Sequence, residues 1–346
     1  MATQYWMITN RNITGSGNKR TLGRDKDELT YWTSAGDKPI DALSSWAPQS
    51  KDKFQKALVA AANNFPDVEL QDHEDQKHVT IFVHGYNNRW DGAAKRYQSI
   101  VNNLFTGPDG LGICVLFTWP SDGVPQAYLP DREDARKSAD DLASVLSDLY
   151  DWMLQKQIAA LEGDDAACRA KTSLIAHSMG NYLVQCAMQN VWTRKNRPLL
   201  VSLINQLLMV AADVDNDIFK TGDAVGNADG EGIANLTYRV TALYSGMDSV
   251  LGMSAGLKHF GKRRLGRSGL DLKTPVPDNV WDIDCSSYFR RDEANVHSAY
   301  FEYEATIDLM RQLLRGVDRR VLVRGNIAPP PPEMAVAPTA PGGDQS

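Results

Sequence analysis

One pentapeptide, Ala176-His177-Ser178-Met179-Gly180, constrains the fold of this 346-residue chain more than any other feature. It lies between an apolar run at Thr172–Ile175, typical of a strand, and a run at Asn181–Val191, typical of a helix. A serine in a sharp turn between a strand and a helix has the arrangement of a nucleophile elbow. Such a turn strains its central residue and requires small flanking residues, so that the helix can begin close to the strand. Ala176 and Gly180 meet this requirement, although Ala176 adds a methyl group where glycine is usual.

A second motif lies upstream of the candidate nucleophile, Ser178. The β-branched and aromatic run Val79–Val83 predicts a strand, and it ends in His84-Gly85-Tyr86. Histidine and glycine at the carboxyl end of such a strand mark the loop with which a serine hydrolase supplies one backbone N–H to an oxyanion hole, while the other N–H follows the nucleophile. We therefore expect Tyr86 and Met179 to be the two donors.

Neighbouring residues in both motifs are assigned supporting roles. Gly85 allows the chain to pass close to a bound carbonyl group. We expect His84 to organise its loop through hydrogen bonds rather than to titrate. His177 adjoins the nucleophile, but its side chain should point away from that of Ser178, so we interpret it as structural.

Strand-like and helix-like runs alternate along most of the chain. This order predicts a largely parallel sheet whose ligands lie at the carboxyl ends of the strands. The expected strands are Tyr5–Ile8, Leu29–Trp32, Val79–Val83, Ile113–Trp119, Thr172–Ile175, Leu203–Ala212, Tyr238–Tyr244 and Trp281–Cys285. The expected helices are Lys51–Phe65, Arg89–Phe105, Asp131–Leu154, Asn181–Val191 and Ala299–Leu314.

With both motifs placed, the chain resembles the α/β-hydrolase superfamily, and more narrowly a bacterial subgroup of unknown function. The resemblance covers about Lys77 to Leu314, and it implies a serine-dependent hydrolase with a three-layer fold: a mostly parallel central sheet, helices on both faces and no large cap domain. The phrases that carry the narrower resemblance are Ile81–Asn87, Phe117–Ser121, Ala176–Asn181 and Ala212–Asp217.

A serine hydroxyl needs a base, which in this fold follows the serine in the order Ser, Asp or Glu, His. Only His259 and His297 lie after Ser178. His259 belongs to a charged stretch expected to face solvent. His297 follows the last expected strand and precedes the last expected helix, so we assign it the role of base.

The acid that orients this base should be a carboxylate at a strand end. Asp248 follows the strand Tyr238–Tyr244 and is preferred, while Asp213, after the preceding strand, stays open as an alternative. Asp213, Asp215 and Asp217 do not fit a calcium loop, because Ile218 stands where glycine is required and Ala224 where glutamate is required. Helix capping and loop hydrogen bonds are the preferred interpretation of this acidic run. We expect no metal and no cofactor.

Composition restricts the cellular context and the partners. The formal charge of −6 argues against a general nucleic-acid binder. No segment is typical of a signal peptide or a membrane span. The cysteines show no paired spacing, which favours reduced thiols and a soluble, cytoplasmic protein; they are Cys114, Cys168, Cys186 and Cys285.

Three parts of the chain are expected. Residues 1–70 should form early strands and a helix that pack on the core, residues 71–325 the catalytic domain, and residues 326–346 a disordered, proline-rich tail. The basic stretch Lys258–Arg267 offers weak contact with an anionic membrane surface, although a solvated loop is the simpler reading.

Carboxylic ester hydrolysis through an acyl-enzyme is the default expectation, because an alkoxide leaves more readily than an amine. The short link between Ala212 and Tyr238 predicts an open or lightly covered site for small-molecule or lipid-like acyl esters. Amidase, thioesterase, lipase and non-catalytic interaction functions on the same fold stay open, and the sequence does not indicate an oligomeric state.

Overall fold

A nine-stranded sheet organises the part of the chain that the structure, a computed structural model, describes: residues 4–66, 68–161, 170–195, 202–220, 229–258, 261–273 and 275–331. The strand order is β3-β2-β1-β5-β4-β6-β7-β8-β9. In this spatial order, each strand from β1 through β5, β4, β6, β7 and β8 to β9 pairs in parallel with the next. The strand β2 pairs antiparallel with both β1 and β3. The strands are β1 (Gln4–Thr14), β2 (Thr21–Ala35), β3 (Ala47–Gln49), β4 (His78–Val83), β5 (Gly112–Thr118), β6 (Lys171–His177), β7 (Ile204–Val210), β8 (Thr237–Tyr244) and β9 (Val280–Asp284).

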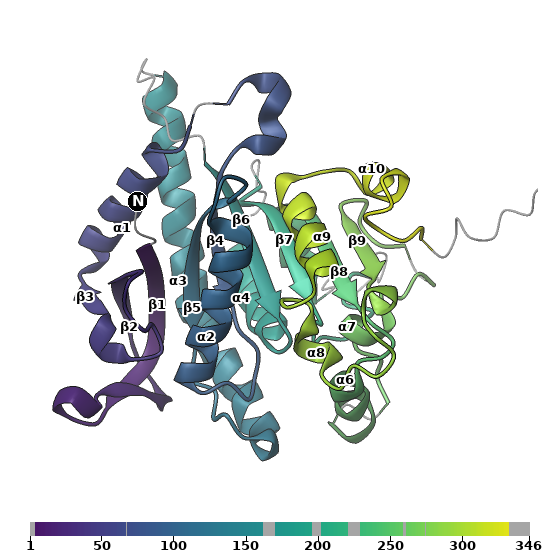
Figure 1. Ribbon diagram of the computed structural model, residues 1–346, viewed down its shortest axis with the longest axis horizontal. Helices are drawn as coiled ribbons and strands as arrows, with labels where there is room; N and C mark the ends of the chain where they lie inside the picture. Colours follow the sequence, from purple (N-terminus) through teal and green to yellow (C-terminus); the bar gives the residue numbers. More distant parts are fainter. Residues whose placement is uncertain are drawn as a thin grey trace, which may run out of the picture.

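Helices cover both faces of this sheet, with α2 and α9 in front and α3 and α4 behind it in Figure 1. The longer helices are α1 (Lys51–Asn63), α2 (Trp90–Ile100), α3 (Tyr128–Leu161), α4 (Gly180–Lys195) and α9 (Glu304–Arg315). The shorter ones are α5 (Glu231–Leu236), α6 (Ser249–Met253), α7 (Leu265–Ser268), α8 (Val296–Ala299) and α10 (Arg319–Arg324). A π-helical turn follows α2 at Val101–Phe105 and another follows α6 at Ser254–Lys258.

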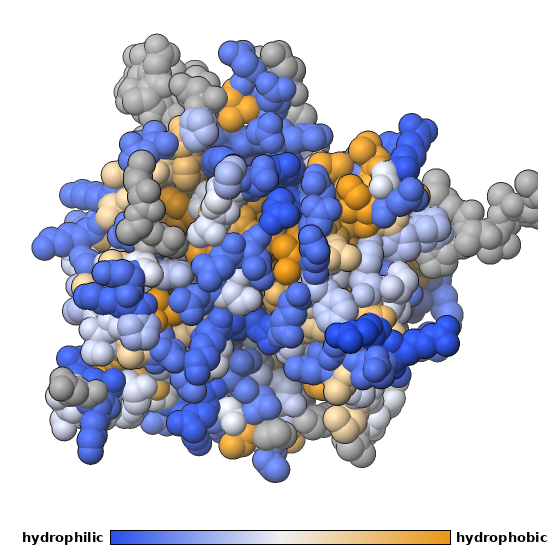
Figure 2. All heavy atoms as spheres, in the orientation of Figure 1, coloured by the Kyte–Doolittle hydropathy of each residue, from blue (hydrophilic) through white to orange (hydrophobic). Residues whose placement is uncertain are grey.

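The apolar residues of each central strand alternate between two cores. In β4, Ile81 and Val83 pack with α3 and α4, whereas Phe82 packs with α2 and α9. Successive side chains of a strand point to opposite faces, so a strand covered on both sides must be apolar throughout. Figure 2 shows one outer face of the molecule, which is hydrophilic over most of its area.

The expected α/β-hydrolase architecture is confirmed, and the described residues that follow β7 and β8 add only the short helices α5, α6 and α7. Two element predictions were wrong in extent. The hairpin β1–β2 is much longer than the two expected runs, because the polar residues Thr9, Asn10 and Arg11 are buried and hydrogen-bonded within the structure.

The last expected helix, Ala299–Leu314, is divided into α8 and α9. The Thr306 hydroxyl, in the first turn of α9, lies 2.7 and 2.9 Å from the carbonyl oxygens of Tyr300 and Tyr303, and so satisfies backbone groups where the chain turns. A further helix, α10, was not expected.

Several sequence predictions concern residues outside the described ranges. Those are His259, Cys168 and residues 332–346 of the proline-rich tail. Cys114, Cys186 and Cys285 are free thiols. In the described residues, no helix has the length and apolar character needed to cross a membrane.

Candidate active site

The turn between β6 and α4 holds Ser178 in a left-handed conformation, with φ of 53°. Three groups stabilise this strained backbone: the Ser178 N–H donates to the Val210 carbonyl (3.0 Å), the Asp213 N–H donates to the Ser178 carbonyl (3.2 Å), and Asn181 Nδ2 donates to the Ala176 carbonyl (2.9 Å). The serine is therefore fixed to the end of β7 as well as to its own strand.

Two glycines allow this turn to approach the loop after β4. A Cβ atom on Gly180 would lie 2.6 Å from the His84 carbonyl oxygen, and one on Gly85 would lie 2.7 Å from the Ser178 Cβ. Both distances are shorter than real Cβ contacts, so neither position accepts a side chain without movement. The two sequence motifs thus meet at the serine, and Tyr86 and Met179, the expected oxyanion donors, each follow one of the residues in contact.

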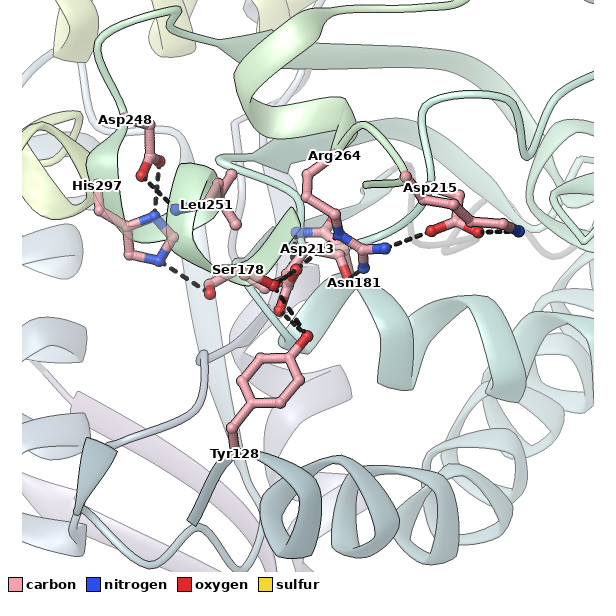
Figure 3. A network of polar contacts seen from close by, with 11 residues as sticks. Tyr128, Ser178, Asn181, Asp213, Asp215, Asp248, Leu251, Arg264 and His297 are labelled. Carbon is pink, nitrogen blue, oxygen red and sulfur yellow. Dashed lines mark hydrogen bonds and ion pairs between the residues drawn. The ribbon is translucent and has the colours of Figure 1, made fainter. Parts of the chain in front are cut away.

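A chain of hydrogen bonds joins Ser178, His297 and Asp248, as Figure 3 shows. His297 Nε2 lies 2.9 Å from the Ser178 Oγ, and His297 Nδ1 lies 2.7 Å from Asp248 Oδ2. The other carboxylate oxygen, Oδ1, accepts from the Leu251 N–H at 2.9 Å and so caps α6. The His297 ring is therefore held between Asp248 and Ser178, with its Nε2 directed at the serine hydroxyl.

His84 occupies a fully buried position behind the loop that contacts Ser178. Its ring nitrogens lie 2.8 Å from the Gly85 carbonyl oxygen and 3.0 Å from Thr118 Oγ1, and its ring stacks on Trp119. Burial, assisted by the nearby Arg11 charge, lowers the pKa of His84 to about 3. The imidazole is thus neutral at physiological pH and acts through hydrogen bonds.

Two buried residues that the sequence did not single out support the same loop. Arg11 Nη2 donates to the Asn88 carbonyl (2.9 Å), and Arg11 Nε donates to Thr118 Oγ1 (3.0 Å). Asp131 accepts from the Asn87 N–H (3.1 Å). Burial lowers the pKa of Arg11 to about 9, while the Asp131 carboxylate opposes that shift.

Asp131 also explains the phrase Phe117–Ser121, because it accepts from Ser121 Oγ at 2.6 Å. Arg11 lies beyond the expected strand Tyr5–Ile8 and resembles a loop residue in sequence, and its partners lie 77 and 107 residues away. No local pattern could have identified those partners.

Asp213, the alternative acid, has different partners from Asp248. Its Oδ1 accepts from Arg264 Nε (2.8 Å) and from Ser254 Oγ (3.0 Å), and its Oδ2 accepts from the Tyr128 hydroxyl (2.7 Å). Figure 3 shows this group behind the serine, on the side away from His297. Tyr128 in turn packs edge-on against Tyr86, at 5.4 Å between ring centroids.

The expected basic surface at Lys258–Arg267 was partly wrong. Arg264 is 0% exposed, because its charge is neutralised by Asp213 and Asp215. Arg267 donates to the Asp248 carbonyl, and Lys262 pairs with Asp215. Arg264 and Arg267 are therefore engaged within the chain, while Lys262 pairs with Asp215 at the surface.

In the acidic run after β7, the expected loop hydrogen bonds are present at Asp213, which accepts from Tyr128 and Ser254, but the expected helix capping was wrong. Asp215 forms ion pairs with Arg264 and Lys262, and Asp217 Oδ2 lies 2.6 Å from Lys220 Nζ. None of the helices in the described residues begins within this run. No group of three histidine, cysteine, aspartate or glutamate side chains in the described ranges is placed to hold a metal ion.

The expectation of an open or lightly covered site was also wrong. Ser178 is 1% exposed and His297 is 8% exposed. Tyr128 and Ser254, with 3.2 Å between their hydroxyl oxygens, both contact Asp213, whose N–H donates to the Ser178 carbonyl. The short link between β7 and β8 did not predict that Ser178 would be buried.

A strained serine between a parallel strand and a helix, with an imidazole on its hydroxyl, defines the α/β-hydrolase class of fold and site. Residues 62–274 match the family described as alpha/beta hydrolase of unknown function (DUF900), and the chain belongs to this family. The matched region includes Ser178 and Asp248 and ends before His297. No curated protein matches the chain.

Solved structures with a similar arrangement are remote in sequence. Lipase B of Aspergillus fumigatus is 14% identical, with a TM-score of 0.40, over 80% of this chain and 62% of that chain. An esterase of Pyrobaculum calidifontis is 11% identical, with a TM-score of 0.33, over 83% and 92%. A peroxisomal alpha-beta-hydrolase of Saccharomyces cerevisiae is 9% identical, with a TM-score of 0.35, over 92% and 90%. The chain spans less than two thirds of the length of the lipase.

Proposed function

We propose that this protein is a serine hydrolase that cleaves carboxylic esters, with Ser178 as nucleophile, His297 as base and Asp248 as the acid that orients the base. The observation that carries the proposal is the hydrogen-bond chain from the Ser178 hydroxyl through the His297 ring to the Asp248 carboxylate, at 2.9 and 2.7 Å. A buried carboxylate on Nδ1 holds the tautomer in which Nε2 can accept the serine proton, and it stabilises the imidazolium that then forms.

In the proposed reaction, Ser178 Oγ attacks the acyl carbon while His297 Nε2 takes its proton. The Tyr86 and Met179 N–H groups stabilise the oxyanion of the tetrahedral intermediate. His297 then returns the proton to the leaving alkoxide, and an acyl-enzyme remains. Water, deprotonated by the same nitrogen, releases the acid. One oxyanion donor typically contributes on the order of a hundredfold or more in rate.

An ester is the proposed substrate because its leaving group departs more readily than an amine. The burial of Ser178 favours small-molecule or lipid-like acyl esters. No metal or cofactor enters any step of this chemistry.

A fluorophosphonate probe and a panel of esters with graded acyl length test the proposal. The wild-type protein should be labelled and should hydrolyse at least one ester faster than the matching amide. Ser178→Ala should be unlabelled and inactive. A matched control is Ser173→Ala. Ser173 is a buried serine near the start of β6, at the opposite end of that strand from the turn that holds Ser178. Equal labelling of wild type and Ser178→Ala would overturn the assignment of the nucleophile.

A further inference from the structure

His297 lies on a short element that requires an external support. Its helix, α8, has four residues, and no side chain caps its N-terminus. The chain between β9 and α8 contains only a short 3-10 turn. Such a segment does not by itself hold an imidazole within hydrogen-bond distance of Ser178, so contacts to the backbone of residues 296–299 become important.

The backbone carbonyl of His297 is bound by His177. His177 Nε2 lies 2.8 Å from that carbonyl oxygen, and the centroids of the two imidazole rings are 5.0 Å apart at an interplanar angle of 47°. A carbonyl only accepts, so Nε2 of His177 must carry the hydrogen. Burial, together with the nearby His297, lowers the pKa of His177 well below its ordinary value, which leaves the ring neutral.

Neighbouring residues restrict the His177 ring. Gly85 lies so close that an added Cβ would be 3.2 Å from His177 Nδ1, and the Phe301 ring packs nearly perpendicular to the imidazole at 5.4 Å between centroids. Arg96 lies over Phe301 and donates to the Ser298 carbonyl at 3.2 Å. The charged or titratable groups facing His177 are therefore His297, Arg96 and His84.

We propose that His177 is a positioning residue for the base: its Nε2–H fixes the His297 backbone to the strand that carries the nucleophile. This inference rests on the proposed function. His177 directly precedes Ser178 in the chain, so this one hydrogen bond fixes the position of the His297 backbone relative to that of Ser178. A displacement of about 1 Å between reacting groups can lower a rate on the order of a hundredfold.

Two substitutions of similar length separate a positioning role from simple core packing. His177→Gln keeps an N–H donor at about the position of Nε2, whereas His177→Met fills the space without a donor. We expect His177→Met to lower kcat and the rate of fluorophosphonate labelling about 10- to 100-fold, with KM changed less than about twofold. His177→Gln should recover most of the loss.

The acid limb of the pH–rate profile should stay in place in both variants, because His177 itself is neutral across that range. His78→Met is the matched control for loss of a buried histidine. His78 is the first residue of β4, at the opposite end of the strand from the loop that contacts Ser178. This variant should reduce the melting temperature and leave kcat unchanged. His177→Phe is a second donor-free variant if the methionine variant does not fold.

Wild-type kcat in a folded donor-free variant, or equal losses in the glutamine and methionine variants, would overturn the inference alone. Ser178→Ala is measured in the same assay. Full labelling or full activity of Ser178→Ala would overturn the proposed function, and the inference with it.

Discussion

Asp248 and Asp213 follow neighbouring strands, β8 and β7, at the same edge of the sheet, and both carboxylates are buried. Asp248 contacts His297, an imidazole that can gain and lose a proton. Asp213 contacts Arg264, a guanidinium that keeps its charge. Burial at a strand end is common to both carboxylates. They differ in the group that each one contacts, an imidazole for Asp248 and a guanidinium for Asp213.

The surroundings of the two side chains fit these partners. Asp248 divides its oxygens between the His297 ring and the N-terminus of α6. Asp213 accepts hydrogen bonds from Arg264, Tyr128 and Ser254, which belong to three separate segments. Arg264 compensates its charge, and the two hydroxyl groups satisfy its remaining acceptor sites.

The largest effect is expected for Asp248→Asn. The amide presents a donor to His297 Nδ1 and favours the wrong tautomer, so kcat should fall about 10⁴-fold. Asparagine is also a good N-cap residue, so the melting temperature should change little. Steady-state kinetics and thermal unfolding of the same preparation test both statements. A stable variant with near-normal kcat would remove Asp248 from the mechanism.

Asp213→Asn should act mainly on stability. Removing one partner of a buried ion pair costs about 3–5 kcal/mol, and Asp215, which also pairs with Arg264, should keep the loss near the lower end of that range. Denaturant unfolding measures this loss, and the kcat of the folded protein should fall far less than in Asp248→Asn. A stable but inactive Asp213→Asn, beside an active Asp248→Asn, would transfer the acid role to the earlier strand.

The double variant Asp213→Asn with Arg264→Met is the control for the Asp213 prediction. If the two side chains act as a pair, the double variant should be more stable than the sum of the single losses implies, by about 0.5–3 kcal/mol. Strict additivity would show that Tyr128 and Ser254, rather than Arg264, account for the effect.

Acid pH should produce the smallest effects and should separate activity from stability. If a histidine is the base, activity should depend on pH, whereas the charge of an arginine does not change in this range. Activity should rise from about pH 6 to 7.5. A rate that stays flat across this window, with chemistry limiting, would argue against a histidine base.

Thermal stability should respond to other histidines. Burial first, and nearby positive charge second, lowers the pKa of His78 and of His84 from 6.5 to about 3. Below about pH 6.5 the unfolded chain binds more protons than the folded protein. The contribution of these two histidines to the free energy of unfolding is therefore complete above about pH 6.5 and is lost as pH falls toward 3. The melting temperature should fall over this range, and less steeply in His78→Gln. An unchanged slope in that variant would contradict the prediction.

Local patterns predicted much of the fold and the membership of the candidate site. Apolar runs mark strands that are buried on both faces, which is why β4 to β9 were all expected close to their observed bounds. The hairpin β1–β2 was underestimated because the buried polar groups of Thr9, Asn10 and Arg11 resemble an exposed loop in sequence. Their hydrogen-bond partners lie about a hundred residues away.

The sequence by itself determined the turn at Ser178 and the loop at Gly85, because both depend on the size and backbone freedom of adjacent residues. Only the tertiary structure decided which aspartate contacts His297, that Arg264 is buried, and that Arg11 and Asp131 support the loop. Tertiary structure likewise enclosed Ser178. The physical reason is that these features are electrostatic and steric pairings between distant segments, and the energy of a charge depends on the partner and the solvent that folding leaves beside it.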